Sequence, residues 1–319
     1  MKAVYQDRYG LSDVLRFKDV DHPTVGEREV LVRVTAAGMD PGVWHLMTGM
    51  PYAVRLMGYG FRAPKDRIRG RDLAGVVEAV GAKVTKFKAG DEVFGVAEGT
   101  FAEYVSAKET ALARKPANLT FEQAAALAIS AFTAVQALRK AGVRSGHKVL
   151  VIGAAGGVGT FAVQLAKHHG AHVIGVCSTS KVDFVHGLGA DDVIDYTRED
   201  LTGEHDIILD CAGNRSLTKL RRVLKPNGTL VLVGGERGGG ILGGMDRVVR
   251  ASLLSLFISQ NLRGIFAVES PEDLELIRDL AEQGAITPAI DRTYPLNAVP
   301  EAIDHVQKGR VRGKVVITV

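Results

Sequence analysis

The chain has 319 residues, of which 46% are hydrophobic and 24% charged, and its formal net charge is +4. This length suits about two domains, and this composition excludes a disordered or fibrous protein. No apolar run approaches the roughly 18 residues that cross a membrane, the first residues lack the apolar core of a secretory signal, and no nucleic-acid-binding motif is present. We therefore expect a cytoplasmic protein without a membrane span or a nucleic-acid partner. The two cysteines, Cys177 and Cys211, lie in apolar runs and are expected to be small core residues rather than disulfide partners or metal ligands.

The first 120 residues are β-rich. Short apolar or alternating segments recur, separated by glycine, proline and aspartate; they lie at residues 1–5, 30–36, 75–80, 92–96 and 101–105. Dense turn signals such as the sequence KAGD at 88–91 favour a compact antiparallel or barrel-like domain.

The remainder alternates between helix and strand. Residues 121–141 are alanine-rich and helical, and Thr120 with Gln123 forms a plausible capping box. Strands and helices then alternate from 148 to about 266, which predicts a parallel, doubly wound sheet. The apolar stretch 253–262 is predicted to pack as a core helix, with part of a substrate-pocket wall as the alternative. Two helices and a final strand follow between 267 and 319.

Residues 148–180 have the spacing of a strand, a glycine turn, a helix and a second strand. Ala154, Gly156 and Gly159 occupy the three positions of the dinucleotide-binding fingerprint, with alanine in place of the first glycine. Small residues there permit a tight turn, let the backbone approach a pyrophosphate and let the helix pack on the strand, while the helix N-terminus attracts phosphate. The turn lacks the Lys-Ser/Thr ending of a P-loop, so nucleotide hydrolysis is disfavoured.

The end of the second strand predicts which cofactor is bound. An acid there would bind the adenosine ribose and repel a 2′-phosphate, but no acid lies between Gly170 and Lys181. Instead Ser178, Thr179 and Ser180 offer hydroxyl groups and Lys181 offers a positive charge. We therefore expect NADPH to be preferred over NADH. The structural alternative is that Ser180 caps the next helix and Lys181 is only solvated.

Several motifs together carry a family resemblance. GRDLAGVVEAVG at 70–81, GDEVFG at 90–95, AAGGVG at 154–159 and LGADDVIDY at 188–196 follow one another in that order. With them, the whole chain resembles the medium-chain dehydrogenase/reductase superfamily in its zinc-free quinone oxidoreductase branch. The resemblance implies a GroES-like substrate domain formed by residues 1–120 and 267–319, a Rossmann domain formed by 121–266, an active cleft between the two, and a homodimer built through sheet edges.

The resemblance also implies an activity and cofactor contacts. The activity is zinc-independent, NADPH-dependent hydride transfer to quinones or α,β-unsaturated carbonyls. An enoyl-thioester reductase and a nucleotide-binding protein with little turnover are the alternatives. Besides the fingerprint residues and Ser178 and Lys181, the positions implied to contact the cofactor are Thr133, Gly157, Val158, Tyr196, Gly234 and Ala267.

Zinc-dependent relatives carry a cysteine near position 40 and the sequence Gly-His-Glu at 70–72. This chain has Asp40 between Met39 and Pro41, and Gly70-Arg71-Asp72. Its two cysteines also cannot form a four-cysteine structural site. We therefore expect no metal and no oxidation of simple alcohols.

By the same resemblance, residues 40–49 line the substrate site. Asp40 and Tyr52 are the candidate catalytic groups, although Asp40 equally suits a turn before Pro41. The candidate pocket residues are Trp44, His45, Tyr59 and Phe257. Ordinary packing for Trp44, and a surface or satisfied core position for His45, are the structural alternatives. The basic run from Arg62 to Arg71 is a solvated face or, alternatively, a handle for a phosphate-bearing acyl carrier.

Overall fold

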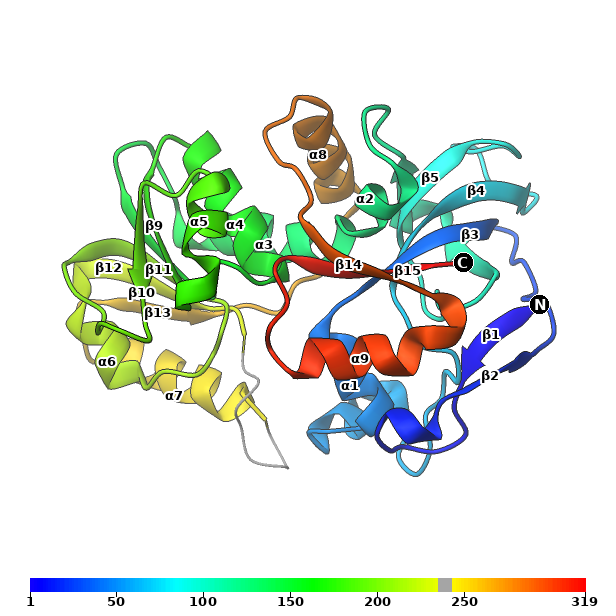
Figure 1. Ribbon diagram of the computed structural model, residues 1–319, viewed down its shortest axis with the longest axis horizontal. Helices are drawn as coiled ribbons and strands as arrows, with labels where there is room; N and C mark the ends of the chain where they lie inside the picture. Colours follow the sequence, from blue (N-terminus) through cyan, green and yellow to red (C-terminus); the bar gives the residue numbers. More distant parts are fainter. Residues whose placement is uncertain (235–242) are drawn as a thin grey trace. The chain divides into compact units, whose positions relative to one another are not determined.

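The computed structural model describes residues 1–234 and 243–319 (Figure 1). Contacts within the chain divide it into two compact units. Unit 1 comprises Met1–Phe132 with Val268–Val319, and unit 2 comprises Thr133–Ala267. The first boundary between the units, from Phe132 to Thr133, lies within the helix α3 (Ala128–Ala141).

Unit 1 is built on a mainly antiparallel seven-stranded sheet. Its path runs through β14 (Ile290–Pro295), β15 (Lys314–Thr318), β3 (Glu29–Met39), β4 (Asp72–Val80), β5 (Glu92–Val96) and β7 (Leu112–Arg114), with β6 (Tyr104–Lys108) paired to β3. The strands β1 (Lys2–Tyr5) and β2 (Arg16–Asp19) form a separate antiparallel pair. The final strand β15 pairs with β3, so the tail of the chain joins the sheet of the first segment.

Short helices complete unit 1. They are α1 (Pro41–Thr48), α2 (Phe121–Ala125), α8 (Pro271–Glu282) and α9 (Val299–Gln307), with helical turns η1 (Ser12–Val14), η2 (Arg55–Tyr59), η3 (Glu109–Ala111) and η5 (Leu296–Ala298). The predicted capping box of Thr120 and Gln123 is present at the start of α2. Alternate residues of β3, namely Val30, Val32 and Val34, are buried in the core, as the period of a half-buried strand requires.

Unit 2 is a parallel six-stranded sheet in the order β10-β9-β8-β11-β12-β13 (Figure 1). The strands are β8 (Lys148–Ile152), β9 (His172–Cys177), β10 (Asp192–Asp195), β11 (His205–Asp210), β12 (Leu224–Leu232) and β13 (Asn261–Gly264). In chain order this is the 3-2-1-4-5-6 arrangement of a Rossmann sheet, so the predicted doubly wound fold is confirmed. Residues 149–152 of β8 are all buried, which is typical of a central parallel strand with both faces covered.

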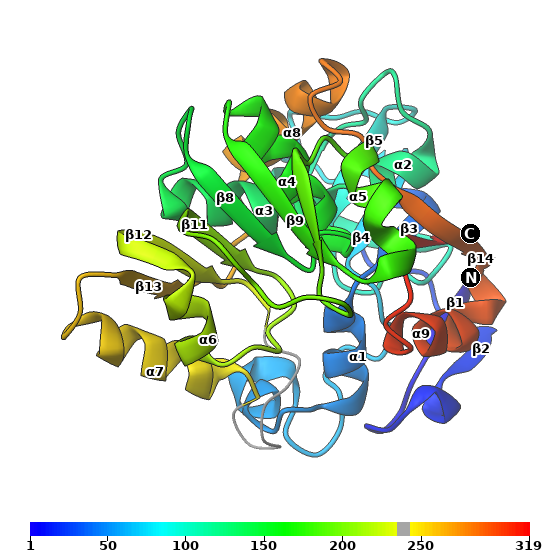
Figure 2. The same cartoon turned by 60° about the vertical axis from the view of Figure 1, so that its left-hand side comes forward.

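The connections of unit 2 are α4 (Gly157–His168), α5 (Val182–Gly187) after the turn η4 (Thr179–Lys181), α6 (Leu217–Arg222) and α7 (Met245–Ser255). Figure 2 shows α6 and α7 beside β12 and β13, which they contact. None of the helices in the described part of the chain has the length and apolar character needed to cross a membrane.

The prediction of a core helix at 253–262 is wrong. The helix α7 ends at Ser255, and β13 begins at Asn261. Leu253, Leu256 and Phe257 are exposed, and Phe257 retains 83% of its accessible surface. An apolar run identifies side chains that could be buried, but it does not say whether a partner surface lies within the same chain.

Candidate functional site

The glycine turn after β8 is formed by Gly153 rather than by the first fingerprint position. Gly153 has φ +80°, in the left-handed region that glycine tolerates, whereas Ala154 is fully buried and is not among the residues with positive φ. The amides of Gly153 and Ala154 both donate to the carbonyl of Val176 on β9, at 3.1 and 3.2 Å. Alanine is therefore accepted at position 154 because Gly153 supplies the sharp turn.

The next two glycines have different roles. A Cβ at Gly159 would lie 2.1 Å from the carbonyl oxygen of Gly153, so α4 can approach β8 only if this residue is glycine. At Gly156 the only atom near such a Cβ is that same oxygen, at 3.4 Å, so the space beside this backbone is open. Gly156 is also the N-cap of α4 and provides no side-chain cap.

The start of α4 is consequently an open anion cradle. The first amides of a helix have no partner within the helix, and here the helix begins at Gly157 and Val158 without a capping side chain. The positive end of the helix dipole adds to their attraction for phosphate. These observations fit a dinucleotide pyrophosphate, which needs donor amides and room for close backbone approach.

Ser178 and Tyr196 meet at the same end of the sheet. Ser178 directly follows β9, and the amide of Tyr196 donates to the carbonyl of Cys177, the last residue of β9, at 3.1 Å. The phenol ring of Tyr196 is half exposed, with the guanidinium of Arg215 5.6 Å from its centre. Lys181 lies close enough to Cys177 to lower the pKa of its thiol, although burial dominates and raises that pKa to about 11.

An acid that sequence reasoning did not select lies at this edge. Asp195 ends β10 directly opposite Cys177, and its carboxylate accepts hydrogen bonds from the hydroxyl of Thr179 at 2.5 Å and from the hydroxyl of Thr197 at 2.7 Å. The hydrogen bond from Thr179, followed by those from Thr197, lowers the pKa of Asp195. The hydroxyl of Thr179 is thus already bound, unlike the free donor expected from the sequence. The signal for this acid was its position at the end of the neighbouring parallel strand.

The end of β11 carries a second buried acid. Asp210 accepts a hydrogen bond from Arg247 at 2.5 Å, and Arg247 also donates to the carbonyl of Arg215 at 2.7 Å. Gly234 follows β12 at this edge, its amide donating to the carbonyl of Asp210 at 3.1 Å. A Cβ there would lie 2.2 Å from the carbonyl oxygen of Cys211, which explains the glycine. The carboxyl edge of the sheet therefore brings together the fingerprint residues and three other predicted residues, namely Ser178, Tyr196 and Gly234.

Three further predicted residues belong to unit 2. Thr133 lies in α3, and Ala267 is exposed in the segment after β13. Phe257 lies before β13, at the amino ends of the strands. The structure does not bring Phe257 together with the nucleotide-site residues.

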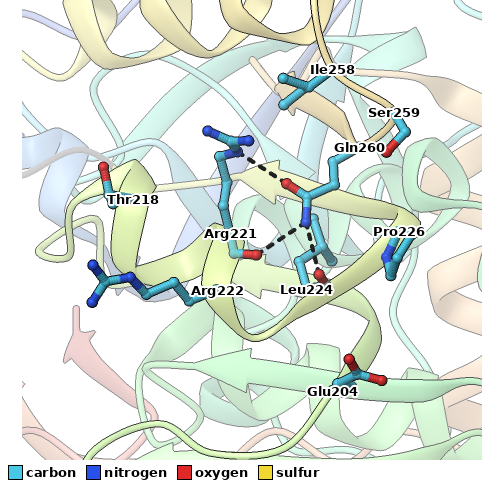
Figure 3. Close-up of a pocket in the computed structure, with 9 residues that line it drawn as sticks. All are labelled: Glu204, Thr218, Arg221, Arg222, Leu224, Pro226, Ile258, Ser259 and Gln260. Atoms are coloured by element: carbon cyan, nitrogen blue, oxygen red, sulfur yellow. Dashed lines mark hydrogen bonds between the residues drawn. The ribbon is translucent and has the colours of Figure 1, made fainter.

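A pocket of about 470 Å³ lies at the amino ends of the strands of unit 2 (Figure 3). It is lined by Glu204, Thr218, Arg221, Arg222, Leu224, Pro226, Ile258, Ser259 and Gln260. The amide of Gln260 is engaged structurally: it accepts from Arg221 at 3.0 Å and donates to the carbonyl of Leu224 at 2.7 Å. None of the predicted site residues lines this pocket.

In unit 1, the candidate substrate residues begin at α1. Asp40 is the N-cap of this helix: one carboxylate oxygen accepts from the amide of Gly42 at 2.7 Å, and the other is buried and has no hydrogen-bond partner among the residues that the structure describes. The turn role considered for Asp40 is therefore present, and one oxygen remains unused. Trp44 packs against the core of unit 1, which agrees with its structural alternative.

His45 and the tyrosines have defined surroundings. Nδ1 of His45 lies 2.8 Å from the carbonyl of Met50, which can only accept, so this nitrogen carries the hydrogen. The ring of Tyr52 is exposed and lies against the guanidinium of Arg55 at 4.9 Å. Tyr59 accepts a hydrogen bond at its carbonyl from the hydroxyl of Tyr9 at 2.9 Å.

Two of the positions compared with zinc-dependent relatives, Arg71 and Asp72, form ion pairs here. Asp72 is fully buried, with one oxygen bound by the amide of Ile129 at 2.8 Å and the other by Lys314 at 2.9 Å. Burial raises the pKa of Asp72, against the opposing effect of Lys314. Arg71 has no lone pair to offer a metal and pairs with Glu98 and Glu269. Within residues 1–234 and 243–319, no group of three or more metal-binding side chains was found. These residues do not fit a zinc site.

The comparisons with known proteins agree with this architecture. Residues 26–117 match the family model described as alcohol dehydrogenase GroES-like domain, and residues 188–317 match that of zinc-binding dehydrogenase. The bovine mitochondrial NAD(P)H oxidoreductase RTN4IP1 is 36% identical over all of this chain and 89% of its own length. Tomato 2-methylene-furan-3-one reductase is 34% identical over 99% of this chain and 79% of its own length.

A solved quinone oxidoreductase from Coxiella burnetii superposes with a TM-score of 0.89 at 29% identity, covering 100% of this chain and 99% of its own. The fold and the site define a Rossmann-type oxidoreductase with a GroES-like partner domain. The chain belongs to the medium-chain dehydrogenase/reductase superfamily, in its zinc-free quinone oxidoreductase branch.

Proposed function

We propose that the protein is an NADPH-dependent reductase of quinones and α,β-unsaturated carbonyls. The observation that carries this proposal is the open, uncapped start of α4 behind Gly156, at the carboxyl edge of a Rossmann sheet. Relatives over 30% identical include enzymes named quinone oxidoreductase, from human, and NADPH-dependent alkenal/one oxidoreductase, from Arabidopsis thaliana. Bound NADPH would supply the hydride, and the protein's residues bind it, orient the substrate and exclude water.

The proposed division of labour follows the edge of the sheet. The amides of Gly157 and Val158 would hold the pyrophosphate, while Ser178, Lys181 and Tyr196 would hold the adenosine end with its 2′-phosphate. Gly234, Thr133 and Ala267 remain proposed neighbours of the nicotinamide.

Unit 1 supplies the proposed substrate side. The unpartnered carboxylate oxygen of Asp40 and the exposed hydroxyl group of Tyr52 are the candidate proton-handling groups. With its Nδ1 hydrogen bound to Met50, His45 has Nε2 left as an acceptor. The proposed pocket residues are still Trp44, Tyr59 and Phe257. The residue ranges of the substrate domain and of the nucleotide domain are also part of this proposal.

We also propose a homodimer formed through the free edge of β13. This strand ends the parallel sheet, and α7, which packs beside it, exposes Val249 and Leu253, with Leu256 exposed directly after it. A two-fold pairing would cover the strand edge and this apolar surface together. The two free thiols, Cys177 and Cys211, support a reducing, cytoplasmic location as part of this proposal.

The test is a turnover screen of wild type and Gly156→Val. NADPH consumption is followed with quinones, enones and enoyl thioesters, and NADP⁺ reduction is followed with simple alcohols. We expect quinones or enones to react best. The valine should block the pyrophosphate cradle and abolish turnover while the protein stays folded, because the Cβ position is open, and a melting curve verifies the fold. A preference for enoyl thioesters would favour an enoyl-thioester reductase. Tight NADPH binding without turnover would favour a nucleotide-binding protein, and preferred oxidation of alcohols would reject the proposal.

A further inference from the structure

One stretch of unit 1 contains no acidic residue. The chain has 36 aspartates and glutamates, yet none occurs from residue 41 to residue 65. The same stretch contains three cations, Arg55, Arg62 and Lys65. We call its second part, residues 52–65, the acid-free loop.

The acid-free loop exposes large apolar side chains close together. Leu56, Met57 and Phe61 retain 76%, 60% and 69% of their accessible surface. A single exposed apolar residue is ordinary, whereas three within six positions of the sequence concentrate apolar surface in one short loop.

The loop is braced at its base. The guanidinium of Arg55 lies between the rings of Tyr9 and Tyr52, at 4.3 and 4.9 Å, and its Nε donates to the carbonyl of Gly49 at 3.0 Å. The hydroxyl of Tyr9 lies 2.6 Å from the carbonyl of Gly60, to which it donates. These contacts hold both ends of the segment from Arg55 to Gly60, so the apolar side chains are presented outward on a supported backbone.

The tip of the loop is open to solvent. Gly58, between Met57 and Tyr59, has φ +100°, and no atom lies within 4 Å of the position of a Cβ. Beside the tip, Arg62 and Lys65 are exposed, and neither side chain has a hydrogen-bond or ion-pair partner among the residues that the structure describes. The exposed Asp66 follows Lys65 directly, so the acid-free loop combines an apolar tip with two cations and ends beside one acid.

We infer that the acid-free loop docks the protein on an anionic lipid surface. Leu56, Met57 and Phe61 enter the boundary between headgroups and acyl chains, while Arg62 and Lys65 lie at the level of the lipid phosphates. An apolar tip beside Arg62 and Lys65 keeps a net positive charge even with Asp66 at the end of the loop, which complements such a surface, whereas a pocket for a neutral partner would not need the cations. The inference goes beyond the proposed function, and the docking does not require turnover.

The test is co-sedimentation of the full chain with vesicles of phosphatidylcholine alone or with one quarter phosphatidylglycerol. Wild type should bind the anionic vesicles, and raising salt from about 50 to 500 mM should release it because the charges are exposed. Arg62→Gln with Lys65→Gln should weaken binding about 10- to 30-fold. Leu56→Ser with Met57→Ser should weaken it about 10-fold or more.

Matched controls change exposed residues of the same kinds elsewhere in unit 1. Lys308→Gln with Arg310→Gln controls for charge, and Phe17→Ser with Leu276→Ser controls for apolar surface. Both controls should bind within about 2-fold of wild type, and melting temperatures verify that every variant is folded. No binding by wild type, equal binding to neutral vesicles, or equal losses in loop and control variants would each overturn the inference. Self-association through the loop without vesicle binding would identify a protein-contact surface instead.

Discussion

The carboxylate of Asp195 accepts a hydrogen bond from the hydroxyl of Thr179 at 2.5 Å, and this bond joins the ends of two neighbouring parallel strands. It fixes the turn that begins at Ser178, where the proposed 2′-phosphate contacts lie. One carboxylate oxygen of Asp195 accepts from the hydroxyl of Thr179 and the other from the hydroxyl of Thr197. Both negatively charged oxygens therefore already have a hydrogen-bond donor.

The first prediction concerns acid stability. The hydrogen bond from Thr179 is the main cause that lowers the pKa of Asp195. Because the pKa of Asp195 is lower in the folded state, its carboxylate stabilises the protein at pH values above the unfolded-state pKa of about 3.9. This stabilisation is lost as the pH falls through the folded-state pKa. Between about pH 5 and 3, the melting temperature of wild type should therefore fall more than that of Asp195→Asn. Asp200→Asn, at an exposed aspartate of the same unit, is the control; an equal fall in wild type and Asp195→Asn would contradict the prediction.

The second prediction tests the packing of α4 on β8. In Gly159→Ala the new Cβ would lie 2.1 Å from a backbone oxygen, so the helix must shift. Overpacking of this kind typically costs about 1–3 kcal/mol, and NADPH binding should weaken as the amides at the helix start move. Gly187→Ala, in α5, has nothing within 4 Å of the Cβ position and should be neutral or stabilising by about 0.5–1 kcal/mol. Denaturant unfolding and NADPH titration measure both, and equal stability of the two variants would count against this account.

Local parts of both units could be predicted from the sequence because they depend on short spacings. The β8–α4–β9 unit and the cap at Thr120 follow from the order of apolar, small and helix-forming residues. The bond between Thr179 and Asp195 could not be predicted in the same way, because it depends on the register of β9 against β10. The exposure of Leu253 and Leu256 was missed because hydropathy does not identify which surface covers a helix.

The third prediction concerns the buried pair of Asp72 and Lys314. Lys314→Met leaves a buried carboxylate without its counter-ion, which typically costs about 3–5 kcal/mol of unfolding free energy. Asp72→Asn with Lys314→Met removes the charge but keeps an acceptor for the amide of Ile129, so it should recover at least half of that loss. Urea unfolding of the two variants gives the comparison. A double variant as unstable as the single one would show that the unpaired charge is not the cause.

The fourth prediction is that activity does not depend on zinc. Arg71 is bound by Glu98 and Glu269, and both oxygens of Asp72 have donors, so neither position fits a metal ligand. Elemental analysis of protein purified without chelator should give well below one zinc per chain, and added chelator should leave quinone reduction unchanged. Stoichiometric zinc whose removal abolishes activity would overturn this expectation.

The last prediction is a preference for NADPH over NADH. Ser178 follows β9 where NAD-binding relatives of this fold place an acid, and Lys181 closes the same turn, its amide donating to the carbonyl of Ser178 at 2.9 Å. A charge-assisted contact contributes roughly 1.5–3 kcal/mol, so Lys181→Ala should weaken NADPH binding about 10- to 100-fold and hardly affect NADH. Ser178→Asp should reverse the preference, because the new carboxylate repels a 2′-phosphate and accepts from the ribose hydroxyls. Lys219→Ala, an exposed lysine on α6, controls for the general loss of positive charge. The measurement is the dissociation constant of each cofactor for wild type and the three variants. The assignment of Ser178 and Lys181 to the phosphate would be wrong if wild type bound NADH more tightly than NADPH. It would also be wrong if Lys181→Ala weakened the binding of both cofactors equally.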